Sequence, residues 1–162
     1  MASAIANRAV QLLVDRQMTV AFAESCTGGR AAAMIAEVPG CSRALWGGWV
    51  VYSNDAKHHC LAVQNATLQT CGAVSEEVVR ELLQGVFMYS PVDCAVAISG
   101  IAGPQGGTPQ KPVGYVWIGV ALRNRGVSVV SRHFDGNRLE IQQSAAEESI
   151  KMIEQQLLLI DK

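Results

Sequence analysis

Three short segments of this chain carry side chains that can do chemistry, and each one follows an apolar run. Ser25 lies in the segment 24–29, Tyr52 and Lys57 bound the segment 52–57, and a stretch rich in glycine and proline spans 99–112. In open α/β sheets, the loops that follow the strands form the ligand crevice. If the three apolar runs are parallel strands, these loops meet at one edge of a sheet and form one site.

Ser25 lies between an apolar run and a helix-like stretch, in the sequence Glu-Ser-Cys-Thr-Gly-Gly. It is either the N-cap of that helix or a nucleophile. The backbone N–H groups at such a helix start can bind an anion or a developing oxyanion. Cys26 is a rival nucleophile, because a helix N-terminus lowers the pKa of a thiol. Thr27 is expected to cap the helix or to bond the backbone.

A serine nucleophile needs a base, because its hydroxyl is weakly nucleophilic at neutral pH. The three histidines (His58, His59 and His133) are typical of exposed or strand-edge positions, which disfavours a Ser-His-Asp arrangement. A lysine that is desolvated among apolar and aromatic groups can lose roughly three pKa units or more and act as a base. Lys57 follows Tyr52 and two tryptophans, so it is the candidate base. The alternative is that Lys57 is an ordinary surface lysine.

The segment 99–112 has the small residues of a loop that approaches a ligand closely. Its glycines at 100, 103, 106 and 107 resemble a phosphate-binding loop, but they match neither the P-loop pattern nor the dinucleotide-binding pattern. A purely structural turn is the alternative interpretation. Arg138 begins the last predicted helix. It is either solvated or suited to a phosphate, because its guanidinium is a fork-shaped cation.

The order of the predicted elements indicates how these loops are positioned. Apolar runs predict strands at Thr19–Ala23, Leu45–Tyr52 and Cys94–Ile98, followed by a hairpin of two more strands at Val113–Leu122 and Val127–Phe134. Gly47 and Gly48 mark a bulge or a close backbone approach in the second strand. Helices are expected near 5–15, 30–36, 54–61, 67–71, 75–87 and 138–159. This order predicts a single domain over 1–162, a three-layer α/β/α sandwich with a mixed, mostly parallel sheet of about five strands.

Charge and hydropathy exclude several classes of protein. The 162 residues carry 13 Lys and Arg against 14 Asp and Glu, with the cations scattered along the chain. Nucleic acid is therefore not an expected partner, because its binding proteins cluster their cations on one face. Membrane insertion is not expected, because no apolar run approaches the roughly 20 residues needed to cross a bilayer. The first residues do not resemble a signal peptide, so we expect a cytoplasmic protein.

The cysteines support the same location. They are five in number, widely spaced and without a C-x-x-C pair: Cys26, Cys41, Cys60, Cys71 and Cys94. This spacing fits neither a disulfide framework nor a zinc site, and it indicates a reducing compartment. We expect no metal site.

Read in order, these segments resemble the CinA carboxy-terminal domain family, whose stand-alone members include nicotinamide-nucleotide amidases. The matching stretches are 23–29, 52–57, 72–77, 100–114 and 136–138, so the resemblance covers nearly the whole chain. It implies hydrolysis of nicotinamide mononucleotide to nicotinate mononucleotide and ammonia in pyridine nucleotide salvage, without a cofactor. It also implies that Ser25 is the nucleophile and that Lys57 and Tyr52 assist it.

A mechanism follows from this resemblance. Neutral Lys57 accepts the Ser25 proton, while Tyr52 relays that proton or orients the amine. Backbone N–H groups of 27–29 or of the 100–103 loop stabilise the oxyanion. Arg138, together with Thr108, holds the 5′-phosphate. The expected substrate contacts are Thr27, Gly28, Gly29, Gly100, Ala102, Gly103, Thr108 and Arg138.

The chain departs from the family pattern at four positions, Asp55, Gln105, Gln110 and Asn137, none of which is a proposed catalytic group. Two alternatives remain open at this point. The first alternative is a non-catalytic module that binds a nucleotide or a protein. The second is an amidase that acts on another small amide. A homo-oligomer is expected, with a two-fold dimer as the default. Trp46 and Trp49 are candidates for either an interface or the core.

Overall fold

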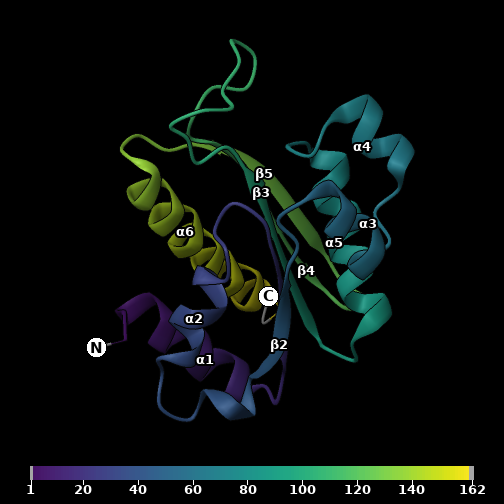
Figure 1. Cartoon of the computed structure of the whole chain (residues 1–162). Helices are drawn as coiled ribbons and strands as arrows, with labels where there is room; N and C mark the ends of the chain where they lie inside the picture. Colours follow the sequence, from purple (N-terminus) through teal and green to yellow (C-terminus); the bar gives the residue numbers. More distant parts are fainter. Residues whose placement is uncertain (1, 161–162) are drawn as a thin grey trace.

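A five-stranded sheet runs through the middle of the molecule in the order β2-β1-β3-β4-β5 (Figure 1). The structure is a computed structural model and describes residues 2–160. Strands β1 (Val20–Glu24), β2 (Leu45–Val50) and β3 (Cys94–Gly100) are parallel to one another. Strands β4 (Tyr115–Leu122) and β5 (Val127–His133) are antiparallel to their neighbours. The carboxyl ends of the three parallel strands therefore share one edge of the sheet, as the sequence predicts.

Helices cover both faces of the sheet and make the molecule a three-layer α/β/α sandwich (Figure 1). One face carries α1 (Ala4–Asp15), α2 (Arg30–Ala36) and α6 (Arg138–Leu159), and the short 3-10 helix η1 (Cys41–Arg43) leads into β2. The other face carries α3 (Asn54–Leu61), α4 (Asn65–Cys71) and α5 (Glu76–Tyr89). Each face therefore has its own apolar core against the sheet.

Strand β1 supplies both cores, because successive strand residues point to opposite faces of the sheet. Phe22 packs into the core under α1, α2 and α6, whereas Ala21 and Ala23 pack into the core under α5. All five residues of β1 are buried, which is typical of a central parallel strand. Glu24 is the last of these five residues, and it is a carboxylate in an apolar strand.

The edge strand β2 contains the irregularity that its paired glycines predict. The pairing register between β1 and β2 shifts after Val20, next to Gly47. A Cβ atom on Gly48 would lie 2.8 Å from the Phe22 carbonyl oxygen, so this position requires glycine. Trp46 is 47% exposed, and its ring stacks on Trp49 with centroids 5.8 Å apart. Trp46 is therefore not a core residue.

Helix ends follow the capping signals in the sequence. The Ser75 hydroxyl accepts a hydrogen bond from the Val78 N–H at the start of α5. Asn137 and Glu140 form a reciprocal capping box at the start of α6. This box fixes the position of Arg138, the first residue of the helix. Within residues 2–160, no helix combines the length and apolar character that a membrane span requires.

Candidate active site

A lysine amine and a serine hydroxyl meet at the carboxyl edge of the parallel strands. Lys57 Nζ lies 3.1 Å from Ser25 Oγ, although 32 residues separate the two along the chain. Ser25 follows β1 directly, and Lys57 lies on α3, the helix that follows β2. Lys57 is only 1% exposed, so its interpretation as a surface lysine is wrong.

Two backbone carbonyls hold the Lys57 amine in place. Lys57 Nζ donates to the Val51 oxygen at 3.0 Å and to the Tyr52 oxygen at 3.1 Å. Together with Ser25 Oγ, these oxygens provide an acceptor for each of the three N–H bonds of an ammonium group. When the amine is neutral, two N–H bonds stay with the carbonyls and the lone pair points at the Ser25 hydroxyl. This arrangement suits a base.

Burial also prepares Lys57 to lose its proton. Desolvation lowers the Lys57 pKa from 10.5 to about 8, and the nearby Cys26 opposes this shift. At that pKa, about a tenth of the lysine side chains are neutral at pH 7. A proton acceptor is therefore present under neutral conditions without a histidine.

Ser25 is not the cap of α2. Its own N–H donates to the Ile98 oxygen of β3 at 3.0 Å, which ties the serine to the sheet. The N-cap position of α2 belongs to Gly29, which has a left-handed backbone and makes no side-chain cap. Ser25 Oγ instead lies between Lys57 Nζ and, at 3.4 Å, the Tyr52 carbonyl oxygen. The side chain is 7% exposed. The nucleophile interpretation is therefore favoured over the capping interpretation.

The buried carboxylate of Glu24 caps α2 in place of Ser25. Its Oε2 accepts from the Thr27 hydroxyl at 2.6 Å, and from the N–H groups of Gly29 and Ala31, each at 3.1 Å. Its Oε1 accepts from the Ala32 N–H at 2.8 Å. Sequence reasoning overlooked this residue, because a glutamate that ends an apolar strand is indistinguishable from the first exposed residue of a loop.

Two of the three backbone N–H groups expected to bind the oxyanion at the start of α2, those of Gly28 and Gly29, already have acceptors inside the chain. The Gly29 N–H bonds Glu24, and the Gly28 N–H donates to the Ser25 carbonyl at 3.1 Å. The Thr27 hydroxyl is also bonded to Glu24. The Gly29 N–H is therefore occupied by an internal anion and the Gly28 N–H by a backbone carbonyl, which differs from the expectation for these two residues.

Cys26 is poorly suited to act as the nucleophile. Burial raises its thiol pKa to about 12, and the neighbouring Glu24 contributes to the rise, so little thiolate exists at neutral pH. The Cys26 carbonyl accepts a hydrogen bond from Gln142 Nε2 at 2.8 Å. Gln142 lies on α6 and holds the serine turn from outside the sheet. No sequence signal pointed to it.

Tyr52 meets the lysine through its backbone, and its phenol points elsewhere. The Tyr52 carbonyl accepts from both Lys57 Nζ and Ser25 Oγ. Tyr52 is 54% exposed, and its phenol oxygen accepts a hydrogen bond from Arg138 Nη2 at 2.5 Å. Arg138 Nη1 donates to the Gly103 oxygen at 2.8 Å. Arg138 thus joins the loop after β2 to the loop after β3.

The other residues predicted to contact the substrate lie in or beside the loop that follows β3, at different distances from the sheet. Gly100 ends β3, where a Cβ atom would lie 2.6 Å from the Val116 side chain, so glycine is needed for strand packing. Ala102 is buried beside Gly103. Thr108 is exposed and accepts from the Lys111 N–H within the loop, which extends well beyond the sheet (Figure 1). The structure does not bring Thr108 into contact with the serine–lysine pair.

The histidines take no part in the pair. Each histidine ring nitrogen lies near a backbone carbonyl oxygen. His58 Nδ1 is 2.8 Å from that of Val63, His59 Nδ1 is 3.0 Å from that of Asp55, and His133 Nε2 is 3.0 Å from that of Val113. Within residues 2–160, no group of three or more His, Cys, Asp and Glu side chains is arranged to hold a metal ion.

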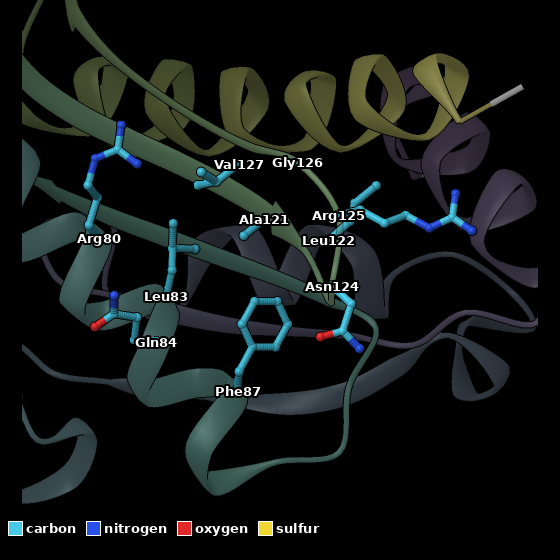
Figure 2. Close-up of a pocket in the computed structure, with 10 residues that line it drawn as sticks. All are labelled: Arg80, Leu83, Gln84, Phe87, Ala121, Leu122, Asn124, Arg125, Gly126 and Val127. Carbon is cyan, nitrogen blue, oxygen red and sulfur yellow. The ribbon is translucent and has the colours of Figure 1, made fainter. Parts of the chain in front are cut away.

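A mainly apolar hollow of about 480 Å³ adjoins Arg138, and it is lined also by Ala102, Pro104 and Leu139. A second cavity, of about 260 Å³, lies between α5 and the turn that joins β4 to β5 (Figure 2). Leu122, before that turn, pairs with the first residue of β3, which places this cavity at the opposite end of the sheet from Ser25. Its walls include Leu83, Phe87 and Val127 and offer no nucleophile.

The fold and the site define an α/β/α sandwich protein with a buried serine–lysine pair at the carboxyl edge of its parallel strands. A family model described as the CinA C-terminal domain matches residues 2–157. The chain belongs to the CinA C-terminal domain family.

Known proteins of this family resemble the chain over most of its length. A CinA-like protein of Endomicrobium trichonymphae is 41% identical over 154 residues, which are 95% of this chain and 36% of that protein. A CinA-like protein of Thermotoga maritima is 53% identical over 111 residues, which are 68% of this chain and 27% of that protein. The chain thus spans about a third of the length of such curated relatives.

Solved structures share the whole architecture. A competence/damage inducible protein from Agrobacterium tumefaciens superposes with a TM-score of 0.90 at 36% identity, covering 98% of this chain and 94% of that one. A CinA superfamily protein from Klebsiella pneumoniae superposes with a TM-score of 0.91 at 31% identity, covering 96% of each chain.

Proposed function

We propose that this chain is an amide hydrolase, with Ser25 as the nucleophile and Lys57 as the general base, and that its substrate is nicotinamide mononucleotide. The single observation that carries the proposal is the 3.1 Å contact between Lys57 Nζ and Ser25 Oγ in a buried setting that lowers the lysine pKa. A nucleophile within hydrogen-bond reach of a base is the basic requirement of covalent acyl transfer. The family resemblance described above supplies the choice of substrate.

The reaction proceeds in two halves. The Ser25 hydroxyl gives its proton to the neutral Lys57 amine, and Oγ bonds to the carboxamide carbon of the substrate. When the carbon–nitrogen bond breaks, the Lys57 ammonium returns that proton to the departing nitrogen, and ammonia leaves. Water then loses a proton to Lys57 and attacks the serine ester, which releases nicotinate mononucleotide and restores the Ser25 hydroxyl. Lys57 is base and acid in turn.

The oxyanion and the phosphate need donors of their own. The N–H groups of Gly28, Gly29 and Ile101 bond within the chain, so the backbone N–H groups of Thr27, Ala102 and Gly103 are the donors that we assign to the oxyanion. Arg138 carries a guanidinium next to this loop, where it bonds the Gly103 carbonyl and the Tyr52 phenol. A phosphate can replace these neutral acceptors, because charge-assisted bonds to phosphate are stronger.

The test is ammonia release from nicotinamide mononucleotide by the purified protein. We expect turnover by the wild-type chain, and loss of turnover in Ser25→Ala without loss of the fold by circular dichroism. Cys26→Ala is the matched control, because its thiol is the neighbouring nucleophile, and it should retain turnover. Hydrolysis of other small amides but not of this nucleotide would correct the substrate. Tight nucleotide binding without hydrolysis of any amide would establish a binding module instead.

A further inference from the structure

Glu24 is a buried carboxylate that forms no ion pair with any residue of the described range 2–160. Its side chain is 1% exposed, and it accepts four hydrogen bonds, from the Thr27 hydroxyl and from the N–H groups of Gly29, Ala31 and Ala32. Burial of a carboxylate is costly unless its oxygens are hydrogen-bonded. All four donors lie within the eight residues that follow Glu24 in the chain. The carboxylate therefore folds this stretch back onto the end of β1.

Ser25 is the residue on which this arrangement acts most directly. It sits between Glu24, which is fixed in the sheet, and Thr27, which is bonded to the Glu24 side chain. The Ser25 N–H is fixed to Ile98 and its carbonyl accepts from the Gly28 N–H. These bonds hold the backbone on both sides of Ser25, and the backbone in turn directs the Ser25 side chain toward Lys57.

We propose that Glu24 is the positioning residue of the nucleophile, because its carboxylate holds the turn in which Ser25 Oγ faces Lys57 Nζ. The inference rests on the proposed function only in that Ser25 must be an activated nucleophile. It does not depend on which amide is the substrate. Glu24 has a second effect on the same turn, since its charge helps to raise the pKa of the Cys26 thiol and so favours the hydroxyl as the attacking group.

The substitution Glu24→Gln tests this inference with almost no change in size. The amide NH₂ would replace one oxygen and would face N–H donors that need an acceptor. We expect kcat to fall about 100-fold or more, because a shift of about 1 Å in a reacting group has an effect of this size. KM should stay within about three-fold, because Arg138 and the 100–103 loop are untouched.

Asp93→Asn is the matched control, because Asp93 plays a similar structural part at the opposite end of the sheet. Its Oδ2 accepts from the Thr19 N–H at 2.8 Å and from the Thr19 hydroxyl at 3.1 Å. Asp93→Asn should lower the unfolding temperature and leave kcat unchanged. Both variants are to be assayed at a temperature where circular dichroism shows them fully folded. Glu24→Gln should then lose kcat per folded molecule, and Asp93→Asn should not.

Labelling with a fluorophosphonate keeps this test separate from the choice of substrate. The labelled peptide, identified by mass spectrometry, should contain Ser25, and labelling should be about 100-fold slower in Glu24→Gln than in the wild-type chain. If the nucleotide is not hydrolysed but Ser25 is labelled, the proposed substrate fails and the role of Glu24 is still measured. The inference is overturned if folded Glu24→Gln labels at the wild-type rate, if it matches Asp93→Asn in kcat, or if wild-type Ser25 is not labelled.

Discussion

Tyr52 connects Lys57 to Arg138 through two different atoms. Its carbonyl oxygen accepts from Lys57 Nζ at 3.1 Å, and its phenol oxygen accepts from Arg138 Nη2 at 2.5 Å. The backbone of one residue therefore orients the base, while its side chain holds the cation that we assign to phosphate binding. One of the two roles expected for Tyr52 is to orient the Lys57 amine, and the Tyr52 carbonyl is placed to do this. The exposed phenol has no contact with the serine–lysine pair in the described structure.

Tyr52→Phe separates these two roles, because it removes the phenol oxygen and keeps the carbonyl. We expect kcat to change by less than about five-fold, since the Lys57 contacts are retained. KM should rise several-fold, because Arg138 loses the acceptor that places it. Steady-state kinetics on the nucleotide measures both constants. A fall in kcat of about 100-fold or more would instead assign the phenol to proton transfer.

The pH dependence of turnover follows from the lowered pKa of Lys57. In the proposed mechanism the neutral amine is the active form and its pKa is about 8, so kcat/KM should rise with pH and level off above about pH 8. Below that pH, the rate should fall tenfold per pH unit. A profile that is flat from pH 6 to 9 would contradict the assignment of Lys57 as the base.

Lys57→Met tests the base and the cost of its burial together. Methionine fills a similar volume without a charge, so turnover should drop by about 1,000-fold or more. The buried lysine has a pKa of about 8 in the folded chain and 10.5 when exposed, so the unfolded chain binds more protons between these values. The wild-type free energy of unfolding should therefore gain about 3 kcal/mol from this group as pH rises from 8 to 10.5.

Urea unfolding at pH 7.5, 9 and 10.5 measures this effect as the difference between wild type and Lys57→Met, in which the other titrating groups cancel. The free energy of unfolding of the wild type, relative to that of Lys57→Met, should increase as pH rises from 7.5 to 10.5. A difference that is independent of pH would show that the lysine keeps its ordinary pKa in the folded chain.

The sequence predicts the sheet and the gathering of the loops because these depend on patterns within each segment. Apolar runs that end in small residues identify the strand ends, and the order of strands and helices places those ends at one edge. Burial of Lys57 is different. Its helix reads Asn-Asp-Ala-Lys-His-His, a polar stretch, and only the packing of α3 against the sheet places Lys57 inside. Tertiary contacts therefore decide the environment of the proposed base.

The sequence does not reveal the roles of Glu24 and Gln142, because it does not identify the hydrogen-bond partners of either side chain. A buried polar side chain is recognised by its hydrogen-bond partners, and the partner of Gln142 is the carbonyl of Cys26, 116 residues away. For Glu24 the partners are close in the chain, but they include backbone N–H groups at the start of a helix. Because every helix start has such N–H groups, the residue types do not show which side chain bonds them. The Glu24 carboxylate also occupies the Gly29 N–H, and the Ser25 carbonyl occupies the Gly28 N–H, which the glycine pattern cannot reveal.

Gln142→Leu tests the bond that α6 makes to the serine turn. The Cys26 carbonyl would lose its donor in a buried site, and an unsatisfied buried acceptor costs about 1–3 kcal/mol. We expect the free energy of unfolding to fall by this amount and kcat to fall about ten-fold, because the carbonyl belongs to the residue after Ser25.

The control is Gln143→Leu, the next residue on the same helix. Gln143 Nε2 donates to Glu147 Oε1 at 2.8 Å and to Met34 Sδ at 3.7 Å, and within residues 2–160 no hydrogen bond joins its side chain to the serine turn. This variant should keep the wild-type kcat. Equal losses of kcat in the two variants would mean that α6 acts through general stability rather than through the Cys26 carbonyl.

Arg138→Met tests whether the guanidinium binds the phosphate of the substrate, and it is best measured with two substrates. On nicotinamide mononucleotide, kcat/KM should fall about 100-fold, because a charge-assisted bond to phosphate is lost. On nicotinamide riboside, which has no phosphate, the same variant should change kcat/KM less than about three-fold. Arg138→Lys should recover only part of the loss on the nucleotide, because an ammonium cannot form the two parallel bonds of a guanidinium. Equal losses on both substrates would instead mean that Arg138 acts by bridging Tyr52 to Gly103, and that the phosphate is bound elsewhere.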